Sequence, residues 1–230
     1  ALDSVAQQSY GDIEHLVIDG VSTDGTLDVV NTRHHSGMQV ISEPDDGIYD
    51  ALNKGVAAAA GGVIGLMHSD DFFAHEGVLD SVAKRFAQTG ADAVYGDLDY
   101  VSARDPDKIV RHWQSGSYDR QKLVRGWMPP HPALFVRREV LERYGNYDTS
   151  YRIAADYDAI LRWFWTENIS AAYLPEVLVK MRVGGESNRS IGRIVNKSKE
   201  DYRALRSNGV GGIGTLAWKN LRKIPQFLNK

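Results

Sequence analysis

Two adjacent carboxylates end the segment His68-Ser69-Asp70-Asp71, which directly follows the apolar run Val63–Met67. Neighbouring carboxylates at the end of a strand can bind Mg²⁺ or Mn²⁺ and leave coordination positions for diphosphate oxygens. The alternative is a loop in which Asp71 caps the next helix. A motif this short does not decide between the two by itself.

A single carboxylate, Asp19, follows the apolar residues Leu16–Ile18. Its oxygens could accept a hydrogen bond from the N–H of a nucleobase. The next polar residues, Ser22–Asp24, are typical of a helix N-terminus, and we interpret them as capping residues. Asp19 lies too early in the sequence to cap that helix, so we expect it to bind a ligand.

The pattern Ala154–Thr166 predicts a helix that begins with two acids. Asp158 precedes Arg162 by four residues and is interpreted as half of a surface ion pair. Asp156 lies at the helix start, where the dipole favours its ionised form. It could accept the proton of an attacking hydroxyl as a general base, or simply cap the helix. His131, in a proline-rich turn, could approach the substrate, although a lone histidine in a turn is more often structural.

Alternating strands and helices position these acids. Short apolar runs predict four strands: Leu16–Ile18, Gln39–Ile41, Val63–Met67 and Ala91–Tyr95. The alternation predicts parallel strands with right-handed crossovers in an open α/β sheet. Polar segments follow these runs at Asp19, Glu43–Asp46, Asp70-Asp71 and Gly96-Asp97, where such sheets bind ligands. We also expect antiparallel strands at Leu98–Val101 and Ile109–Trp113, and a helix at Arg137–Tyr144.

The composition limits the class of protein. The 230 residues are 43% hydrophobic and 25% charged, which is ordinary for a globular protein. A net charge of -3 gives no basic field for nucleic acid, and the absence of cysteine excludes disulfides and thiolate metal sites. The absence of cysteine suits a reducing cytosol, so we expect a cytoplasmic protein. No run reaches the roughly 20 apolar residues that span a bilayer. The chain opens inside a helical pattern, and we expect a fragment of a longer product.

Several of these segments, in this order, resemble glycosyltransferase family 2, whose members have the nucleotide-diphospho-sugar transferase (GT-A) fold. The segments that carry the resemblance are Gln8–Tyr10, Leu16–Thr26, Ser42–Gly55, Ser69–Asp71, His131, Phe135–Arg138, Gly145–Asp148 and Ala155–Asp158. They extend over residues 1–190. The stretch Glu43–Gly55 looks like the branch that builds bacterial exopolysaccharide and lipopolysaccharide, the colanic-acid type included.

The resemblance implies a GT-A catalytic domain at residues 1–190, with a Rossmann-like, mostly parallel sheet flanked by helices. It implies inverting transfer of a hexosyl or related sugar from a nucleotide diphosphate-sugar to a hydroxyl of a sugar or lipid-linked sugar, without a covalent intermediate. Cell-envelope polysaccharide or glycolipid biosynthesis is the implied setting. Direct displacement needs a base at the acceptor, a cation at the departing diphosphate, and a pocket that aligns both substrates.

The resemblance also implies a role for each matched residue. Asp156 would be the general base, Asp70 with Asp71 would bind Mg²⁺ or Mn²⁺, and Asp19 would contact the base of the nucleotide. The remaining residues expected at the donor site are Asp46, Asn53, Lys54, Ser69 and His131.

The chain departs from the family pattern at several positions. The first strand, which lies in the nucleotide site, precedes residue 1, and without it we expect an incomplete sheet and poor activity. His68 replaces the first acid of the Asp-x-Asp motif, and Gly20 replaces an acid beside Asp19. Gly184 stands where many members have a late metal-binding histidine, so a metal would have fewer protein ligands.

Two other functional classes fit part of the pattern. A non-catalytic sugar-nucleotide-binding homologue would explain His68 and Gly184. A sugar nucleotidyltransferase would need a glycine-rich basic loop near the first strand, and no such loop is seen. A nicotinamide dehydrogenase is weaker, because no Gly-x-Gly-x-x-Gly follows a strand.

Residues 191–230 form an amphipathic tail in which apolar residues such as Trp218 and Leu221 oppose basic residues such as Lys219. Such a tail either lies as an interfacial helix on an anionic membrane or packs on the catalytic domain. A lipid-linked acceptor would favour the membrane, at the inner face of the cell membrane.

Overall fold

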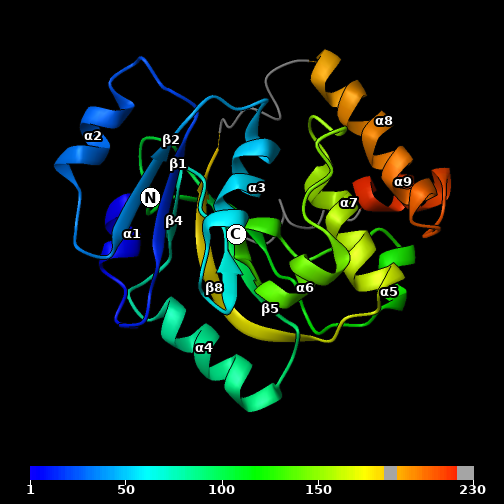
Figure 1. The fold of residues 1–230 in the computed structure, drawn as a ribbon. Helices are drawn as coiled ribbons and strands as arrows, with labels where there is room; N and C mark the ends of the chain where they lie inside the picture. Colours follow the sequence, from blue (N-terminus) through cyan, green and yellow to red (C-terminus); the bar gives the residue numbers. More distant parts are fainter. Residues whose placement is uncertain (184–190, 222–230) are drawn as a thin grey trace.

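The computed structural model describes residues 1–183 and 191–221, and Figure 1 shows their arrangement. The elements of the first ninety residues are α1 (Leu2–Ala6), β1 (His15–Asp19), α2 (Thr26–Thr32), β2 (Met38–Ser42), α3 (Ile48–Ala58), β3 (Val63–Gly65), β4 (Asp71–Phe73) and α4 (Val78–Thr89). The later elements are β5 (Ala93–Val101), β6 (Ile109–Trp113), α5 (Gln121–Val124), the 3-10 turn η1 (His131–Ala133), β7 (Leu134–Arg137), α6 (Arg138–Tyr144), α7 (Ala155–Leu161), the π-helical turn η2 (Arg162–Thr166), β8 (Ala171–Arg182), α8 (Ile191–Ser207) and α9 (Ile213–Leu221).

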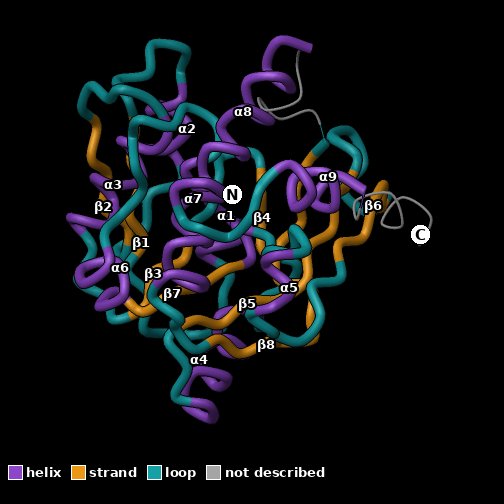
Figure 2. The backbone as a smooth tube through the Cα atoms, turned by 90° about the vertical axis from the view of Figure 1, so that its right-hand side faces the viewer, coloured by secondary structure: helices purple, strands orange, loops and turns teal. Residues whose placement is uncertain are grey.

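The described strands form two sheets, which Figure 2 shows from the side. β1 and β2 pair in parallel, with Asp19 opposite Ser42 at their carboxyl ends. The larger sheet has the order β3-β7-β5-β8-β4, and β6 pairs with β5 outside this path. β5 and β8 are parallel, and antiparallel pairs join β3, β4, β6 and β7 to them. The expected antiparallel pairing of Leu98–Val101 with Ile109–Trp113 is confirmed.

Strand β5 corrects one expectation. We expected Ala91–Tyr95 to end at Gly96-Asp97, but β5 continues through these residues as one nine-residue strand. A Cβ at Gly96 would collide with β8, so the missing side chain lets the two strands approach. Asp97 is therefore buried inside the sheet, where its carboxylate accepts a hydrogen bond from the backbone N–H of Ser115 (2.7 Å). Asp97 therefore joins β5 to the segment that contains Ser115, and it does not line a crevice at a strand end.

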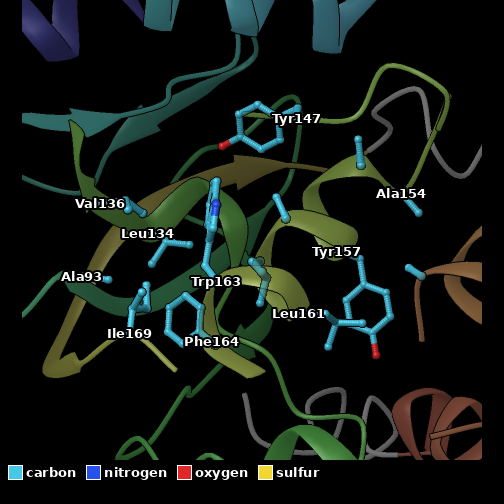
Figure 3. Packing of buried hydrophobic residues seen from close by; sticks show 14 of the residues in the cluster. Ala93, Leu134, Val136, Tyr147, Ala154, Tyr157, Leu161, Trp163, Phe164 and Ile169 are labelled. Atoms are coloured by element: carbon cyan, nitrogen blue, oxygen red, sulfur yellow. The ribbon is translucent and has the colours of Figure 1, made fainter. Parts of the chain in front are cut away.

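Two apolar clusters cover the two faces of β5, because alternate residues of a strand point to opposite sides. Tyr95 belongs to a cluster with α7 and η2, whose fully buried side chains include Tyr157 and Trp163 (Figure 3). Val94 and Leu98 belong to the cluster under α4. The first cluster fixes α7 against the sheet, and with it the start of the helix that carries Asp156.

The described part of the tail packs on the preceding part of the chain. α8 contacts α7, and α9 contacts α8, on the right of Figure 1. The carboxylate of Glu200 accepts a hydrogen bond from the backbone N–H of Ala154 (2.9 Å), just before α7. Lys219, which we had placed on a basic face, is instead buried, with Nζ 2.8 Å from Asp201 Oδ1 and 3.2 Å from the ring centroid of Tyr157. Among the described helices none is long and apolar enough to cross a bilayer.

Candidate functional site

Asp156 lies partly exposed in the first turn of α7, where Ala154 occupies the N-cap position. Asp156 is therefore not the capping residue. The hydroxyl of Tyr49, from α3, lies 3.2 Å from Asp156 Oδ1 and 2.7 Å from the carbonyl oxygen of Ile153. Burial raises the pKa of Asp156, but the electrostatic influence of His131 and of two lysines of the tail outweighs it and leaves the pKa below the ordinary value. The carboxylate is thus ionised at neutral pH, as a proton acceptor requires.

His131 is buried on η1 beside Asp156, and its Nε2 shares a hydrogen bond with the hydroxyl of Tyr147 (3.0 Å). Burial lowers the pKa of His131 to about 4, so its imidazole is neutral at neutral pH. Asn53 fixes Tyr147 in place: its side chain donates to the Tyr147 carbonyl (2.8 Å) and accepts from the Tyr147 N–H (3.0 Å). Asn53, expected at the donor, has both side-chain polar atoms engaged in this way.

Two tyrosines of the site were not found by sequence reasoning. Tyr49 and Tyr147 stack with ring centroids 6.0 Å apart and form the wall between α3 and the His131 turn. Both lie inside segments that carried the family resemblance, but neither was singled out as a site residue. The tyrosine side chains themselves were the available signal, because a buried tyrosine hydroxyl usually has a hydrogen-bond partner.

His68 lies next to His131 and precedes Asp70 and Asp71 in the chain. Its ring centroid lies 6.1 Å from that of His131. Burial lowers the pKa of His68, while the charges of Asp70 and Asp156 act in the opposite direction. Both carboxylates therefore lie close enough to influence one imidazole. The fold brings Asp70 and Asp156, expected as the metal ligand and the base, to the same region.

Asp70 and Asp71 occupy different environments. Asp70 and Ser69 are exposed in the turn before β4, and Arg182 Nη1 donates to the Asp70 carbonyl (2.6 Å). Asp71 is buried in β4, seven residues before α4 begins at Val78, so it does not cap that helix. Neither of its carboxylate oxygens has a hydrogen-bond partner among the residues that the structure describes. Burial and the charge of Asp70 raise the pKa of Asp71 to about 7.

These carboxylates fit a hard divalent cation. Oxygen donors suit Mg²⁺ and Mn²⁺, Asp70 offers an accessible carboxylate, and the unpartnered oxygens of Asp71 add negative potential behind it. No group of three or more acidic or histidine side chains within residues 1–183 and 191–221 could hold a metal ion. A cation here would therefore take further ligands from a bound diphosphate. Gly184, expected at a late metal position, lies outside the described residues.

The carboxylate of Asp19 has a structural role that its position in the sequence did not indicate. Its Oδ2 accepts hydrogen bonds from the backbone N–H of Ser22 (3.1 Å) and the hydroxyl of Ser42 (2.7 Å). These donors hold the pKa of Asp19 below its usual value. Asp19 does not cap α2, whose N-cap is Gly25, but the chain turns back within three residues and brings the Ser22 N–H to its carboxylate. The same contacts hold an ionised carboxylate at the carboxyl end of β1.

In the neighbouring loop, the carboxylate of Asp45 occupies the space next to Gly20 where a side chain would otherwise lie. A Cβ at Gly20 would lie 2.2 Å from Asp45 Oδ2, so the carboxylate of Asp45 fills the place of a side chain at position 20. Asp45 is held there by the backbone N–H of Gly47 (2.8 Å). Asp46 is exposed beside it, and its N–H donates to Asp50 (3.1 Å).

Lys54, also expected at the donor, lies on α3 and is held by its own loop. Its ammonium group donates to the carbonyl of Pro44 and forms ion pairs with Glu43 (3.2 Å) and Asp50 (3.4 Å). The contacts with Pro44 and Glu43 hold the loop at residues 43–47 against α3, and the pair with Asp50 lies within the helix. In the described structure Lys54 therefore shapes the loop at the end of β2.

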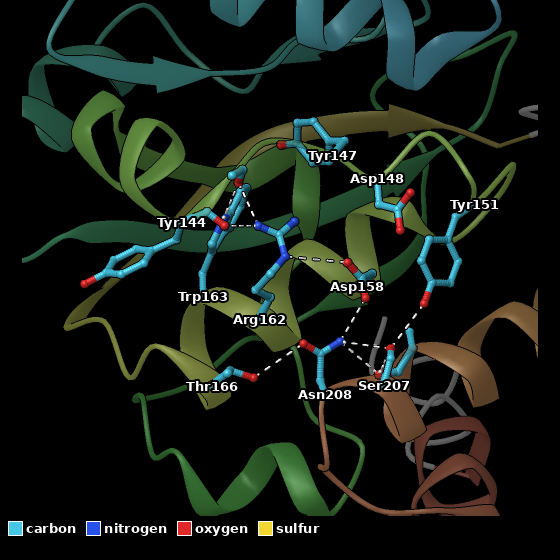
Figure 4. Close-up of polar contacts among 12 residues, drawn as sticks. Tyr144, Tyr147, Asp148, Tyr151, Asp158, Arg162, Trp163, Thr166, Ser207 and Asn208 are labelled. Carbon is cyan, nitrogen blue, oxygen red and sulfur yellow. Dashed lines mark hydrogen bonds and ion pairs between the residues drawn. The ribbon is translucent and has the colours of Figure 1, made fainter.

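A hollow of about 520 Å³ lies elsewhere, between the end of α6, α7 and α8, and Asp156 does not line it. Figure 4 shows that its polar groups bond mainly to each other. Arg162 donates to three backbone carbonyls at residues 144–146 and lies 3.7 Å from Asp158, which is buried and accepts a hydrogen bond from Asn208 (2.8 Å). The predicted Asp158–Arg162 pair is confirmed, but its surface location is wrong.

Comparison with known proteins shows which family the chain resembles. The family model described as "Glycosyl transferase family 2" matches residues 1–145. A PGL/p-HBAD biosynthesis glycosyltransferase of Mycobacterium tuberculosis is 33% identical over 192 residues, which are 81% of this chain and 72% of that protein. An uncharacterized glycosyltransferase of Nostoc is 29% identical and covers 82% of this chain.

Solved structures share the fold. TarS of S. aureus in complex with UDP-GlcNAc has a TM-score of 0.68 at 18% identity and covers 91% of this chain, which in turn spans 60% of that one. The mannosyltransferase PcManGT from Pyrobaculum calidifontis, in complex with GDP-Man and Mn²⁺, has a TM-score of 0.65 at 18% identity and covers 99% of this chain. The expected GT-A α/β class is thereby confirmed.

Proposed function

Because the chain belongs to glycosyl transferase family 2, we propose that its site transfers a sugar from a nucleotide diphosphate-sugar to an acceptor hydroxyl with inversion. One observation carries the proposal: the ionised Asp156 carboxylate, which contacts the Tyr49 hydroxyl, and Asp70 both lie close enough to His68 to influence the pKa of its imidazole. A base and a metal-binding acid in the same region are what direct displacement requires.

In this mechanism Asp156 accepts the proton of the acceptor hydroxyl while that oxygen attacks the anomeric carbon of the donor. The bond from the anomeric carbon to the diphosphate oxygen breaks, and the nucleoside diphosphate leaves with the bonding electron pair. Tyr49 orients Asp156, and neutral His131 with Tyr147 walls the pocket. A divalent cation held by Asp70 would supply positive charge for the departing diphosphate.

The donor nucleotide would lie at the carboxyl ends of β1 and β2. Asp19 is fixed and ionised there, and Asp45 and the exposed Asp46 lie on the adjoining loop. We assign base recognition to Asp19, and a position near the ribose or diphosphate to Asp46 and Ser69. Asn53 and Lys54 act through the elements they fix, Tyr147 and the loop after β2.

We further propose that the acceptor is a sugar or lipid-linked sugar of bacterial envelope polysaccharide or glycolipid, met at the cytoplasmic face of the membrane. The mycobacterial relative is named as a glycosyltransferase of PGL/p-HBAD biosynthesis. The resemblance of Glu43–Gly55 to the exopolysaccharide branch stays a prediction.

Calorimetry tests the donor half of the proposal. UDP, GDP, dTDP and CMP are titrated with and without Mn²⁺ into the chain and into Asp70→Ala. We expect one nucleoside diphosphate to bind in an Mn²⁺-dependent manner, and the variant to lose that dependence. Asp80→Ala, an exposed acid of α4 paired with Lys84, is the matched control. No binding of any nucleotide by the folded protein would refute the proposal, and binding without turnover would favour a non-catalytic homologue.

A further inference from the structure

The buried face of α9 fixes the rotation of this helix about its own axis. Lys219 and Thr215 point inward, and Lys219 forms the buried ion pair with Asp201 under the ring of Tyr157. The backbone of Lys219 also lies against Gly126, where a Cβ would be 2.5 Å from the Lys219 nitrogen. A buried cation and a backbone contact leave little freedom for α9 to rotate about its axis.

The opposite face of α9 is apolar and exposed. Ile213, Trp218 and Leu221 are 75%, 58% and 52% exposed, and they fall on one side of the helix with the exposed Ala217. Within Ile213–Leu221 the exposed positions carry no charge. Large aromatic and aliphatic side chains gathered on one helix face mark an interaction surface more often than a solvated one.

The charge of the tail is opposite to that of the rest of the chain. Residues 191–230 hold nine Lys and Arg against two Asp and Glu, whereas residues 1–190 hold eighteen against twenty-eight. Both acids of the tail are occupied internally, since Asp201 pairs with Lys219 and Glu200 accepts from backbone N–H groups before α7. Lys199 and Arg206 are exposed on α8. Within the described part of the tail, exposed apolar and basic side chains are therefore present without an exposed acid.

We propose that α9 docks on an anionic lipid bilayer, with Ile213, Trp218 and Leu221 at the boundary between headgroups and acyl chains. An apolar helix face next to basic side chains is the combination that binds anionic interfaces. Through Tyr157, which adjoins Asp156, α9 also touches the helix that carries the base. The surface extends the proposed function, because a lipid-linked acceptor would reach Asp156 from this side, but lipid binding does not depend on sugar transfer.

Vesicle flotation of the full chain tests the docking surface. We expect binding to phosphatidylcholine vesicles that contain phosphatidylglycerol, little binding to phosphatidylcholine alone, and weaker binding at high salt. The double variant Trp218→Gln, Leu221→Gln should weaken binding about tenfold or more. Val29→Gln, which replaces an equally exposed apolar residue of α2 (57% exposed), should leave it unchanged.

Other outcomes overturn the proposal. Absence of binding to anionic vesicles would exclude the bilayer, and loss of a dimer in the double variant by analytical ultracentrifugation would assign the face to a second copy of the chain. Equal vesicle binding by the double variant would move the contact to another surface. Nucleotide titration of the same samples keeps this test apart from the proposed function, because the α9 variants should bind nucleotide like the unaltered chain.

Discussion

The hydroxyl of Tyr49 lies 3.2 Å from a carboxylate oxygen of Asp156, although 107 residues separate the two in the chain. The contact joins α3, which follows the loop at the end of β2, to the first turn of α7. The same hydroxyl lies 2.7 Å from the carbonyl of Ile153, so it is anchored to the backbone just before α7. Tyr49 thereby couples the position of the proposed base to the helix that borders the donor site.

Tyr49→Phe tests this coupling. The variant keeps the stack on Tyr147 and removes the donor to Asp156. A hydrogen bond to an ionised carboxylate favours the charged form, so its loss raises the pKa of Asp156. We expect kcat to fall about tenfold and the acid limb of the kcat/KM profile to move to higher pH. A variant with an unaltered pH profile would assign Tyr49 to packing alone.

The buried imidazole of His131 makes stability depend on pH. Its pKa is about 4 in the folded protein and about 6.5 when unfolded, so the unfolded chain takes up the proton first as the pH falls. The contribution of neutral His131 to the free energy of unfolding is about 3 kcal/mol. It is fully present above about pH 6.5 and is lost as the pH falls from about 6.5 to about 4.

His131→Gln, which keeps a polar group near Tyr147 and does not titrate, should flatten this fall. Urea unfolding at neutral pH and near pH 4.5 measures the difference. Burial also lowers the pKa of His15 to about 4. The variant should therefore still lose the part of the unfolding free energy that depends on His15 as the pH falls. Parallel pH curves for the two proteins would show that His131 is not neutral and buried in the folded state.

Gly126→Ala tests the docking of α9. Gly126 has φ +70°, and an added Cβ would collide with the backbone of Lys219, which cannot move aside like a flexible side chain. Gly116 has φ +71° with open space around it, so Gly116→Ala carries the backbone strain alone. We expect the first variant to lose about 2 kcal/mol more unfolding free energy than the second. Equal losses in urea unfolding would place α9 away from Gly126.

Because the Asp45 carboxylate occupies the space of a side chain at position 20, a second substitution at position 45 should restore the stability lost by a substitution at position 20. Gly20→Asp puts a second carboxylate into the space of Asp45 and should lower the unfolding free energy by about 1 to 2 kcal/mol. Adding Asp45→Gly empties that space again, so the double variant should recover at least half of the loss. A double-mutant cycle with a coupling free energy near zero would contradict the spatial substitution.

The strands and acids of the first half were predictable because each short apolar run ends in a polar segment. β1 and β2 lie where the pattern put them, and Asp156 lies at the start of a helix as predicted. The long strand β8 escaped notice because Pro175 interrupts its pattern. In the structure the β5–β8 register shifts between Tyr95 and Asp97, and the bulge accommodates the proline.

The contacts that assemble the site were not predictable, because they join residues far apart in sequence. The Tyr49–Asp156 and Asn53–Tyr147 hydrogen bonds depend on how α3 packs against α7 and the turn before it. Spacing within one helix carries no information about such packing. The inward position of Lys219 had the same origin, since helical periodicity defines faces but not which face a neighbouring element covers.

Release of nucleoside diphosphate from a panel of UDP-, GDP- and dTDP-sugars, with Mn²⁺ and with water as the acceptor, tests the central claim most directly. The comparison is between the unaltered chain and Asp156→Asn, with Asp80→Asn as the control on α4. The account predicts that Asp156→Asn releases diphosphate at least about a hundredfold more slowly while it binds the nucleotide with unchanged affinity. Equal release by the two proteins would show that Asp156 is not the base.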